Sequence, residues 1–148
     1  MRHKLPVFCL CLLTSVLIIT AFSGCGPSET VRAEGEPEYA PVIADDLMQA
    51  FNKGDYETYS KDFDTAMKRA VSETVFKQMR ATVIEKIGNY KSREFTGVEK
   101  DGVYTVVLYN AKFSKEPADV ILKFVFLESG ENTLVSGLWF DSPKLREN

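Results

Sequence analysis

Two aspartates, Asp62 and Asp64, are the residues whose type and spacing come nearest to acid–base chemistry. They flank Phe63 at the expected end of a short helix, and a carboxylate held in a pocket can act as a general base. A calcium loop would continue with acids at alternating positions and a closing glutamate, whereas residues 65–67 carry no carboxylate. The simpler interpretation is that both aspartates are solvated turn residues, so catalysis by either is the less favoured hypothesis.

Histidine and cysteine are almost confined to the N-terminus. The one histidine is His3, and the three cysteines are Cys9, Cys11 and Cys25. Serine and cysteine nucleophiles of the usual kind need an imidazole base, and zinc sites are built largely from Cys and His. The sequence also lacks a glycine-rich phosphate loop and a dinucleotide fingerprint. We therefore expect no such catalysis, no metal site and no cofactor.

Aromatic residues make up 11% of the chain and could line a pocket for an apolar or planar ligand. Tyr56, Tyr59, Phe63 and Trp139 are the candidate binding residues among them. The alternative is that the aromatic residues simply form the hydrophobic core, which is the favoured interpretation. Trp139 and Phe140 are adjacent on an expected strand, so their side chains point to opposite faces and cannot both line one cavity.

The N-terminal segment has the features of an export signal. Arg2-His3-Lys4 is cationic, residues 5–22 carry no charge, and small residues precede Cys25. The uncharged run is at the short limit for crossing a bilayer, so an uncleaved anchor remains the alternative. We expect export across the cell membrane.

The four residues Phe22-Ser23-Gly24-Cys25 resemble the lipobox of prokaryotic lipoproteins, although Phe22 stands where that motif usually has leucine. The resemblance implies that the Cys25 thiol receives a diacylglycerol and that the chain is cut just before it. Two acyl chains anchor a protein stably. We therefore expect residues 1–24 to be a signal peptide, residues 25–38 to be the lipidated cysteine and a flexible tether, and residues 39–148 to be one domain on the outer face of the membrane.

Charge argues against a nucleic-acid partner. The formal net charge is −3, and residues 1–24 hold two basic and no acidic side chains, which leaves 16 basic and 21 acidic ones from Cys25 onward. A nucleic-acid surface would need a basic stripe. The hydrophobic content of 45% is that of a globular chain. If the signal peptide is removed, Cys25 is the one cysteine left, so the fold cannot contain an internal disulfide.

Apolar spacing of three and four predicts three helices, followed by a period of two that predicts strands. The helices are expected over residues 41–53, 56–63 and 72–87, with residues 64–70 as a connector or single turn. Gly54 is expected to end the first helix, and Asp55 and Ser72 can cap the second and third.

Four strands are expected over residues 90–99, 103–114, 118–128 and 133–140, joined by three tight turns, of which the first contains Asp101-Gly102. Helices followed by an antiparallel meander predict an α+β fold with helices on one face of the sheet. The third strand is apolar on both faces, so we expect it to be central. The third helix carries an apolar stripe, which we expect to pack on the concave face of the sheet near Phe124 or its neighbours. The stripe consists of Phe76, Met79, Val83 and Ile87.

This order of elements resembles the cone-shaped fold of the nuclear-transport-factor-two and SnoaL superfamily. Several segments are also similar to a domain family of unknown function that occurs in prokaryotic lipoproteins and joined to α/β-hydrolases. They are Phe51-Asn52-Lys53-Gly54-Asp55-Tyr56, Ser60-Lys61-Asp62-Phe63, Lys86-Ile87-Gly88-Asn89-Tyr90-Lys91-Ser92, Tyr104-Thr105-Val106-Val107, Ala111-Lys112-Phe113 and Ser136-Gly137-Leu138-Trp139-Phe140. The resemblance implies a curved, cone-shaped sheet and no reaction.

The leading hypothesis is a non-catalytic module that binds an envelope protein or a small apolar ligand. The alternative is a small isomerase or cyclase that uses one buried acid, Asp62 or Asp64. A raised pKa on either acid, together with a closed pocket, would favour the enzyme. A third possibility is self-association through a sheet edge, and the sequence leaves the oligomeric state open.

Overall fold

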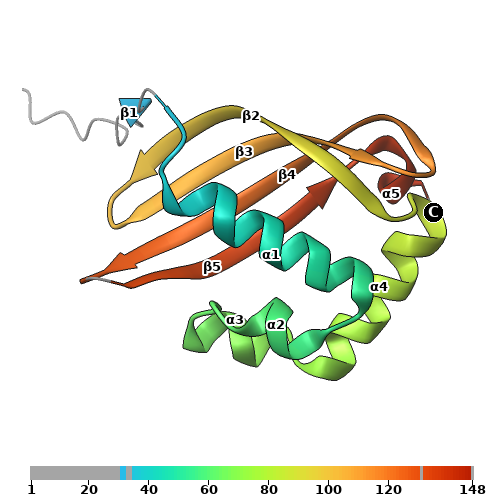
Figure 1. Cartoon of the computed structure of the whole chain (residues 1–148), viewed down its shortest axis with the longest axis horizontal. Helices are drawn as coiled ribbons and strands as arrows, with labels where there is room; N and C mark the ends of the chain where they lie inside the picture. The colour runs from blue at the N-terminus through green and yellow to red at the C-terminus, as the bar shows by residue number, and fades with distance from the viewer. Residues whose placement is uncertain (1–30, 33–34, 131, 148) are drawn as a thin grey trace, which may run out of the picture.

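A run of helices precedes a run of long strands in the structure, in the order predicted for an α+β fold, with a two-residue strand before the helices and a short helix after the sheet (Figure 1). A computed structural model describes residues 31–32, 35–130 and 132–147 of the chain. The elements are, in order, β1 (Val31–Arg32), α1 (Tyr39–Lys53), α2 (Tyr56–Ser60), α3 (Thr65–Ala70), α4 (Glu73–Lys86), β2 (Tyr90–Asp101), β3 (Tyr104–Phe113), β4 (Glu116–Ser129), β5 (Asn132–Asp141) and α5 (Pro143–Arg146). The helices before the sheet and its four long strands confirm the predicted fold class.

Local capping residues set the helix ends. Gly54 ends α1 with a left-handed φ of 75°, which suits a glycine. The Asp55 carboxylate accepts a hydrogen bond from the Thr58 amide and begins α2. The Ser72 hydroxyl accepts one from the Val75 amide and begins α4. These were the signals used in the sequence, and the bounds of α1 and α4 agree closely with the prediction.

Within the described residues, four helices rather than the predicted three precede the long strands. The connector expected over residues 64–70 contains α3, which Asp64 caps by accepting a hydrogen bond from the Met67 amide at 2.7 Å. The second helix ends at Ser60 instead of running to Phe63. A second difference is α5, which follows the sheet and was not predicted. Both missed helices are too short for an apolar stripe to reveal them.

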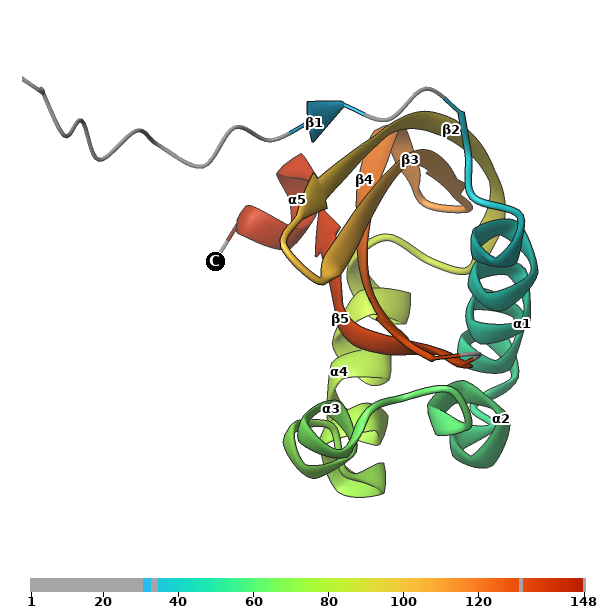
Figure 2. The same ribbon diagram turned by 90° about the vertical axis from the view of Figure 1, so that its left-hand side faces the viewer.

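The strands follow one another across the sheet in the order β1-β2-β3-β4-β5, each antiparallel to the next. The three predicted hairpins are closed by the pairs Asp101–Tyr104, Phe113–Glu116 and Ser129–Asn132. Register shifts at Phe95/Gly97 and at Val125/Phe126 are bulges, which bend strands. Figure 2 shows the resulting curved sheet with α1 on one side of it.

Aromatic rings fill the inner face of the sheet, the face toward α1. Phe124 and Phe126 of β4 and Tyr109 of β3 are completely buried. The ring centroid of Tyr39 lies 5.2 Å from that of Phe126, and Tyr109 lies 5.8 Å from Phe124. The central position predicted for the third long strand, β4, is confirmed by its pairing with β3 and β5.

A second group of rings joins the helices to one another. Phe51 of α1 lies 5.3 Å from Phe140 of β5 and 6.0 Å from both Tyr59 and Phe76. The stripe predicted for α4 is buried at Phe76, Val83 and Ile87 and half-buried at Met79. The ring neighbours of Phe76 are Phe51, Tyr56 and Tyr59 rather than the predicted Phe124. The core side of α4 therefore faces α1 and α2.

Part of the stretch expected to be a tether lies on the domain. The backbone of Val31–Arg32 pairs with Glu99 and Lys100 at the edge of β2. Glu36 accepts a hydrogen bond from the Tyr109 hydroxyl at 2.6 Å. The predicted signal peptide and Cys25 lie outside the described residues, and no helix within the described residues is long and apolar enough to span a membrane.

Candidate functional site

The two candidate catalytic aspartates lie on a segment that covers the edge of β5. The Val135 amide donates to the Asp62 carbonyl at 2.7 Å, and the Asp64 amide donates to the Val135 carbonyl at 3.0 Å. Between them Phe63 forms a parallel bridge with Val135, and its side chain is buried. An open sheet edge invites pairing with other chains, so the backbone of this segment has a structural role.

The carboxylate of Asp64 is engaged in two hydrogen bonds. It accepts from the Met67 amide at 2.7 Å and from the Ser136 hydroxyl at 2.6 Å. Burial alone would raise the pKa of Asp64, but these bonds, the Ala66 amide and the charge of Arg69 outweigh it, so the pKa is lowered. The enzyme hypothesis called for a raised pKa, so this shift gives it no support at Asp64.

The side chain of Asp62 faces a different environment. Its carboxylate lies 3.9 Å from the Lys61 ammonium and is about a third exposed. Lys61 pairs more closely with Asp46 of α1, at 2.7 Å. Asp62 thus belongs to a solvated charge cluster at the junction of α1 and α2.

We expect Asp64→Ala to lower the free energy of unfolding by about 1–2 kcal/mol, because α3 loses its N-cap. Asp64→Asn keeps a capping oxygen, so it should cost less at neutral pH. Since the folded pKa of Asp64 is lowered, its carboxylate adds stability above the ordinary value of 3.8, and this is lost as the pH falls through the folded pKa. Urea unfolding of the full-length variants at neutral and acidic pH measures both effects. Equal unfolding free energies for wild type and Asp64→Ala would contradict the capping role.

The four aromatic candidates do not meet in one site. Tyr59 and Phe63 are buried in the core, with ring centroids 5.2 Å apart. Tyr56 is half-buried and donates its hydroxyl to the Val71 carbonyl at 2.8 Å. Trp139 is 53% exposed, while Phe140 packs against the core, which confirms that these two neighbours face opposite sides of the sheet.

A polar groove lies between α1 and the first residues of β2, and we call it the α1–β2 groove. Its volume is about 530 Å³. The lining residues are Asp45, Gln49 and Asn52 from α1 and Tyr90, Lys91, Ser92 and Arg93 from β2. A second hollow of about 310 Å³ shares Ser92 and Arg93 and continues over Glu94, Asn110, Lys112 and Asp119. The structure thus has a hollowed polar surface centred on residues 92 and 93.

Asn52 fixes one end of the groove, because its side chain forms two hydrogen bonds with the backbone of β2, as a neighbouring strand would. Its side-chain amide donates to the Tyr90 carbonyl at 2.8 Å, and its side-chain carbonyl accepts from the Tyr90 amide at 2.9 Å. These two bonds satisfy both backbone groups of the first residue of β2. The C-terminal turn of α1 is held in turn by Arg80, which donates to the Phe51 and Asn52 carbonyls at 2.6 Å each.

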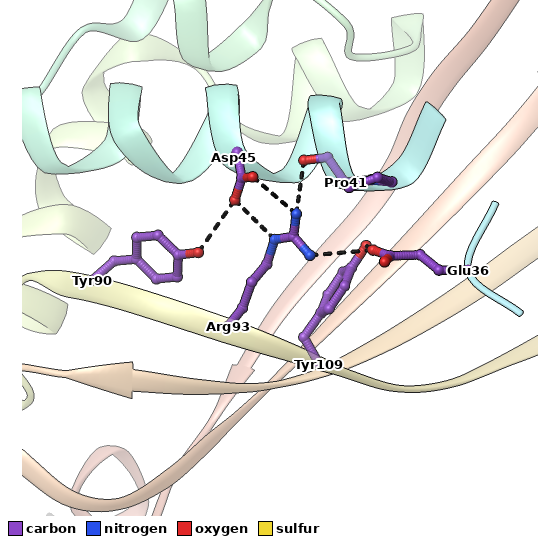
Figure 3. Close-up of polar contacts among 6 residues, drawn as sticks. All are labelled: Glu36, Pro41, Asp45, Tyr90, Arg93 and Tyr109. Atoms are coloured by element: carbon purple, nitrogen blue, oxygen red, sulfur yellow. Dashed lines mark hydrogen bonds and ion pairs between the residues drawn. The ribbon is translucent and has the colours of Figure 1, made fainter. Parts of the chain in front are cut away.

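Arg93 fixes the other end of the groove through a cluster shown in Figure 3. Its guanidinium binds the Asp45 carboxylate in bidentate fashion, at 2.9 and 3.0 Å, and donates to the Pro41 carbonyl at 2.9 Å. It also donates to Glu36 at 3.2 Å and lies over the Tyr109 ring, 4.4 Å from the centroid. One side chain therefore ties α1, β2, β3 and the segment before α1 together.

The electrostatics of this cluster raise the pKa values of Arg93, Tyr90 and Tyr109. Burial works against the charged form of Arg93, but its hydrogen bonds to Asp45 outweigh this and the pKa is raised. Burial and the charge of Asp45 raise the pKa of Tyr90 to about 12. Burial and the hydrogen bond to Glu36 raise the pKa of Tyr109 well above its ordinary value. Both phenols therefore act as hydrogen-bond donors at neutral pH, which suits a rigid binding surface better than proton transfer.

Within residues 31–32, 35–130 and 132–147, no three His, Cys, Asp or Glu side chains gather into a possible metal site. The Asp45 carboxylate, which lines the groove, already forms an ion pair with Arg93. The chemistry left to the groove is hydrogen bonding and charge recognition.

The sequence prediction missed the residues that shape this groove. Asn52 stood in the segment used for the family resemblance, yet its side chain gave no local sign of a partner 38 residues away. Arg93 carried a usable signal, because strand periodicity places it on the same face as Phe95, which packs against the core. A charged residue on an apolar strand face needs an oppositely charged partner, and Asp45 supplies it.

Comparison with known proteins finds one family over most of the domain. The family described as a protein of unknown function (DUF3887) matches residues 44–138, the span that holds the groove. No curated protein matches the chain. A solved structure described as the structure of Bdellovibrio bacteriovorus Bd1075 is similar at a TM-score of 0.45 and 14% identity, covering 71% of this chain and 40% of that one.

Proposed function

Because the chain belongs to the family described as a protein of unknown function (DUF3887), whose description names no reaction, we propose its function from the groove itself. The domain is a non-catalytic binding module that holds a polar ligand, or a polar segment of an envelope protein, in the α1–β2 groove. One observation carries this proposal: the walls of the groove are fixed, while part of its lining is unengaged.

The unengaged lining consists of Gln49, Lys91 and Ser92. All three side chains are exposed, and within the described part of the chain none of them makes a hydrogen bond or an ion pair. Asn52 and Arg93, in contrast, are each held by at least two polar contacts. A site whose walls are ordered before binding loses less entropy when a ligand arrives.

A polar ligand fits this surface better than the small apolar ligand considered from the sequence. The inner face of the sheet, where an apolar ligand would lie, is occupied by Tyr109, Phe124 and Phe126, which contact one another and are fully buried. The groove instead offers amide, hydroxyl and ammonium groups. An isomerase or cyclase would need a poised acid, and the lowered pKa of Asp64 gives it no support.

We further propose that the domain has the cone-shaped fold of the nuclear-transport-factor-two and SnoaL superfamily. The curved sheet with α1 on its inner side supports this (Figure 2), as does the packing of Phe51 between the sheet and α4. In this arrangement the α1–β2 groove lies at the border where the first helix meets the edge of the sheet.

The proposal places the module outside the cell membrane on a lipid anchor. The uncharged run over residues 5–22 and the lipobox-like residues before Cys25 support export and lipidation. Cys25 is six residues before Val31, where the chain first joins the sheet. An anchored domain would meet its partner in the envelope.

Photocrosslinking tests the binding proposal. A photoreactive amino acid in place of Lys91 should give an adduct in intact cells, because this side chain lies in the groove. The same residue in place of Lys77, which is exposed on α4, serves as the matched control and should give little adduct. Adding Ser92→Trp to the Lys91 variant should abolish the adduct by filling the groove. Equal adducts at positions 77 and 91, or an adduct insensitive to Ser92→Trp, would exclude the groove as the site.

A further inference from the structure

The outer face of the sheet, turned away from α1, is unusually apolar. Strand alternation places the side chains between the buried positions of β3, β4 and β5 on this side. We define the outer face by Val106, Leu108, Ile121, Val125, Leu127 and Trp139. Ile121 is 44% exposed and Trp139 53%, and the other four are partly exposed.

These residues form one continuous surface. Val106 pairs with Val125, and Leu108 pairs with Lys123, which in turn pairs with Trp139. An antiparallel sheet that packs helices on one face normally presents polar residues on the other. Here Lys123 stands among apolar neighbours, and the charged residues Glu99 and Asp141 border them, paired with Val106 and Ile121. A contiguous exposed apolar surface of this kind marks an interaction site.

Trp139 lies flat at one side of the outer face. Its ring occupies the space above Gly137, where a Cβ atom would overlap it. The Lys123 ammonium stands 5.5 Å from the centre of the ring. The glycine therefore allows the indole to lie across the sheet, with a broad surface toward solvent.

The length of chain before β1 indicates what covers the outer face. From Cys25 to Val31 there are six residue steps, so even a fully extended chain spans only about 20 Å. A folded domain of about 100 residues has a radius of gyration of about 13 Å. If Cys25 carries the lipid, β1 and the sheet edge that it joins lie within one domain width of the bilayer. The domain is thereby held close to the membrane, so that a suitable surface on it can reach the lipid.

We propose that the outer face rests on the lipid–water interface of the membrane that anchors the chain. This rests on the proposed lipidation of Cys25. Tryptophan has an apolar ring and a polar N–H group and is enriched at this interface. The stem of Lys123 can follow the apolar surface while its ammonium reaches the headgroups. The domain is acidic overall, so apolar contact rather than attraction to anionic lipids holds the face, and uncharged phosphatidylcholine suffices.

Trp139 reports on this contact without labelling, because it is the only tryptophan in the chain. The full-length lipidated protein is reconstituted into phosphatidylcholine vesicles with brominated acyl chains, which quench tryptophan within the lipid. The expected result is a loss of emission with bromolipid, a blue shift with ordinary lipid, and protection from iodide in the water. Emission that bromolipid leaves unchanged and iodide quenches would overturn the proposal. Protection from both quenchers, dependent on protein concentration, would overturn it in favour of a second copy on this face.

Matched variants separate the outer face from the anchor. Ile121→Asp places a charge in the outer face and should reduce quenching by bromolipid. Val42→Asp places the same charge on α1, at a side chain 63% exposed, and should leave quenching unchanged. Cys25→Ser should remove the acyl chains, which the mass of the purified protein measures directly. If the wild-type protein carries no acyl chains at Cys25, lipidation at Cys25 is excluded, while quenching of Trp139 still decides whether the outer face meets lipid.

Discussion

Phe76→Ala is expected to lower the free energy of unfolding by about 3–5 kcal/mol, out of the roughly 5–15 kcal/mol that stabilises a domain. Phe76 is completely buried, and its ring lies 4.5 Å from Tyr59, 5.7 Å from Tyr56 and 6.0 Å from Phe51. Truncation would leave a cavity between three helices, and the surrounding rings are too large to close it without leaving their own contacts. The denaturation midpoint in urea measures the loss.

Lys77→Ala is the matched control on the same helix. Lys77 is 68% exposed and forms an ion pair with Glu73 one turn earlier, a contact worth about 0.3–0.5 kcal/mol. The midpoint should therefore barely move. Equal, small shifts for Phe76→Ala and Lys77→Ala would mean that the space around Phe76 is not filled as described, and would reopen an apolar pocket at this end of the domain.

The fold was predictable from sequence wherever the signal was local. Asp55 and Ser72 indicated where two helices begin, and Gly54 indicated where a helix ends. Asp101-Gly102 indicated a hairpin turn. Each depends on contacts within a few residues, so the sequence alone suffices. The helix α3 does have a local cap, Asp64, but its six residues are too short to show an apolar stripe. The strand β1 exists only as a partner of β2, so no local pattern could reveal it.

The packing of α4 also shows that sequence patterns do not identify contacts between distant parts of the chain. The stripe of Phe76, Val83 and Ile87 was correctly predicted to be buried. The spacing says that a face is buried but not what lies against it. The prediction chose Phe124 of the sheet, whereas the rings against Phe76 come from α1 and α2.

The candidate site was less predictable than the fold. The sequence suggested Asp64 as a possible general base. In the structure its pKa is lowered and its carboxylate caps α3. Arg93 could have been noticed as a charged residue on an apolar strand face, but its partners lie 48 and 57 residues away in the chain, so no local pattern identifies them. Polar clusters of this kind form only when separate elements meet.

Arg93 also connects the domain to the segment that leads toward the proposed lipid anchor. It binds Glu36, which precedes α1, and Glu36 accepts a second hydrogen bond from Tyr109. A tether that ended freely at residue 38 would let the domain turn without restriction. The contacts of Glu36 instead fix the direction in which the chain leaves, which fits a domain that presents one face to the bilayer.

Arg93→Met is expected to lower the free energy of unfolding by about 2–3 kcal/mol in the full-length protein. Breaking a fully buried ion pair costs about 3–5 kcal/mol, and the loss here is smaller because Asp45 remains about half exposed. Methionine retains much of the contact with the Tyr109 ring, so the change isolates the polar bonds. Without the guanidinium, the carboxylates of Asp45 and Glu36 lose the cation that they share.

Lys91→Met is the matched control, since it removes a cation from the same strand at an exposed side chain with no ion pair among the described residues. It should leave the urea midpoint nearly unchanged. Arg93→Lys should recover only part of the loss, because an ammonium cannot form the bidentate bond to Asp45 and reach Pro41 and Glu36 as well. A double-mutant cycle with Asp45→Asn then isolates the pair itself. Additive losses in that cycle would show that Arg93 and Asp45 do not act together, and the groove would lose the fixed wall on which its proposed function depends.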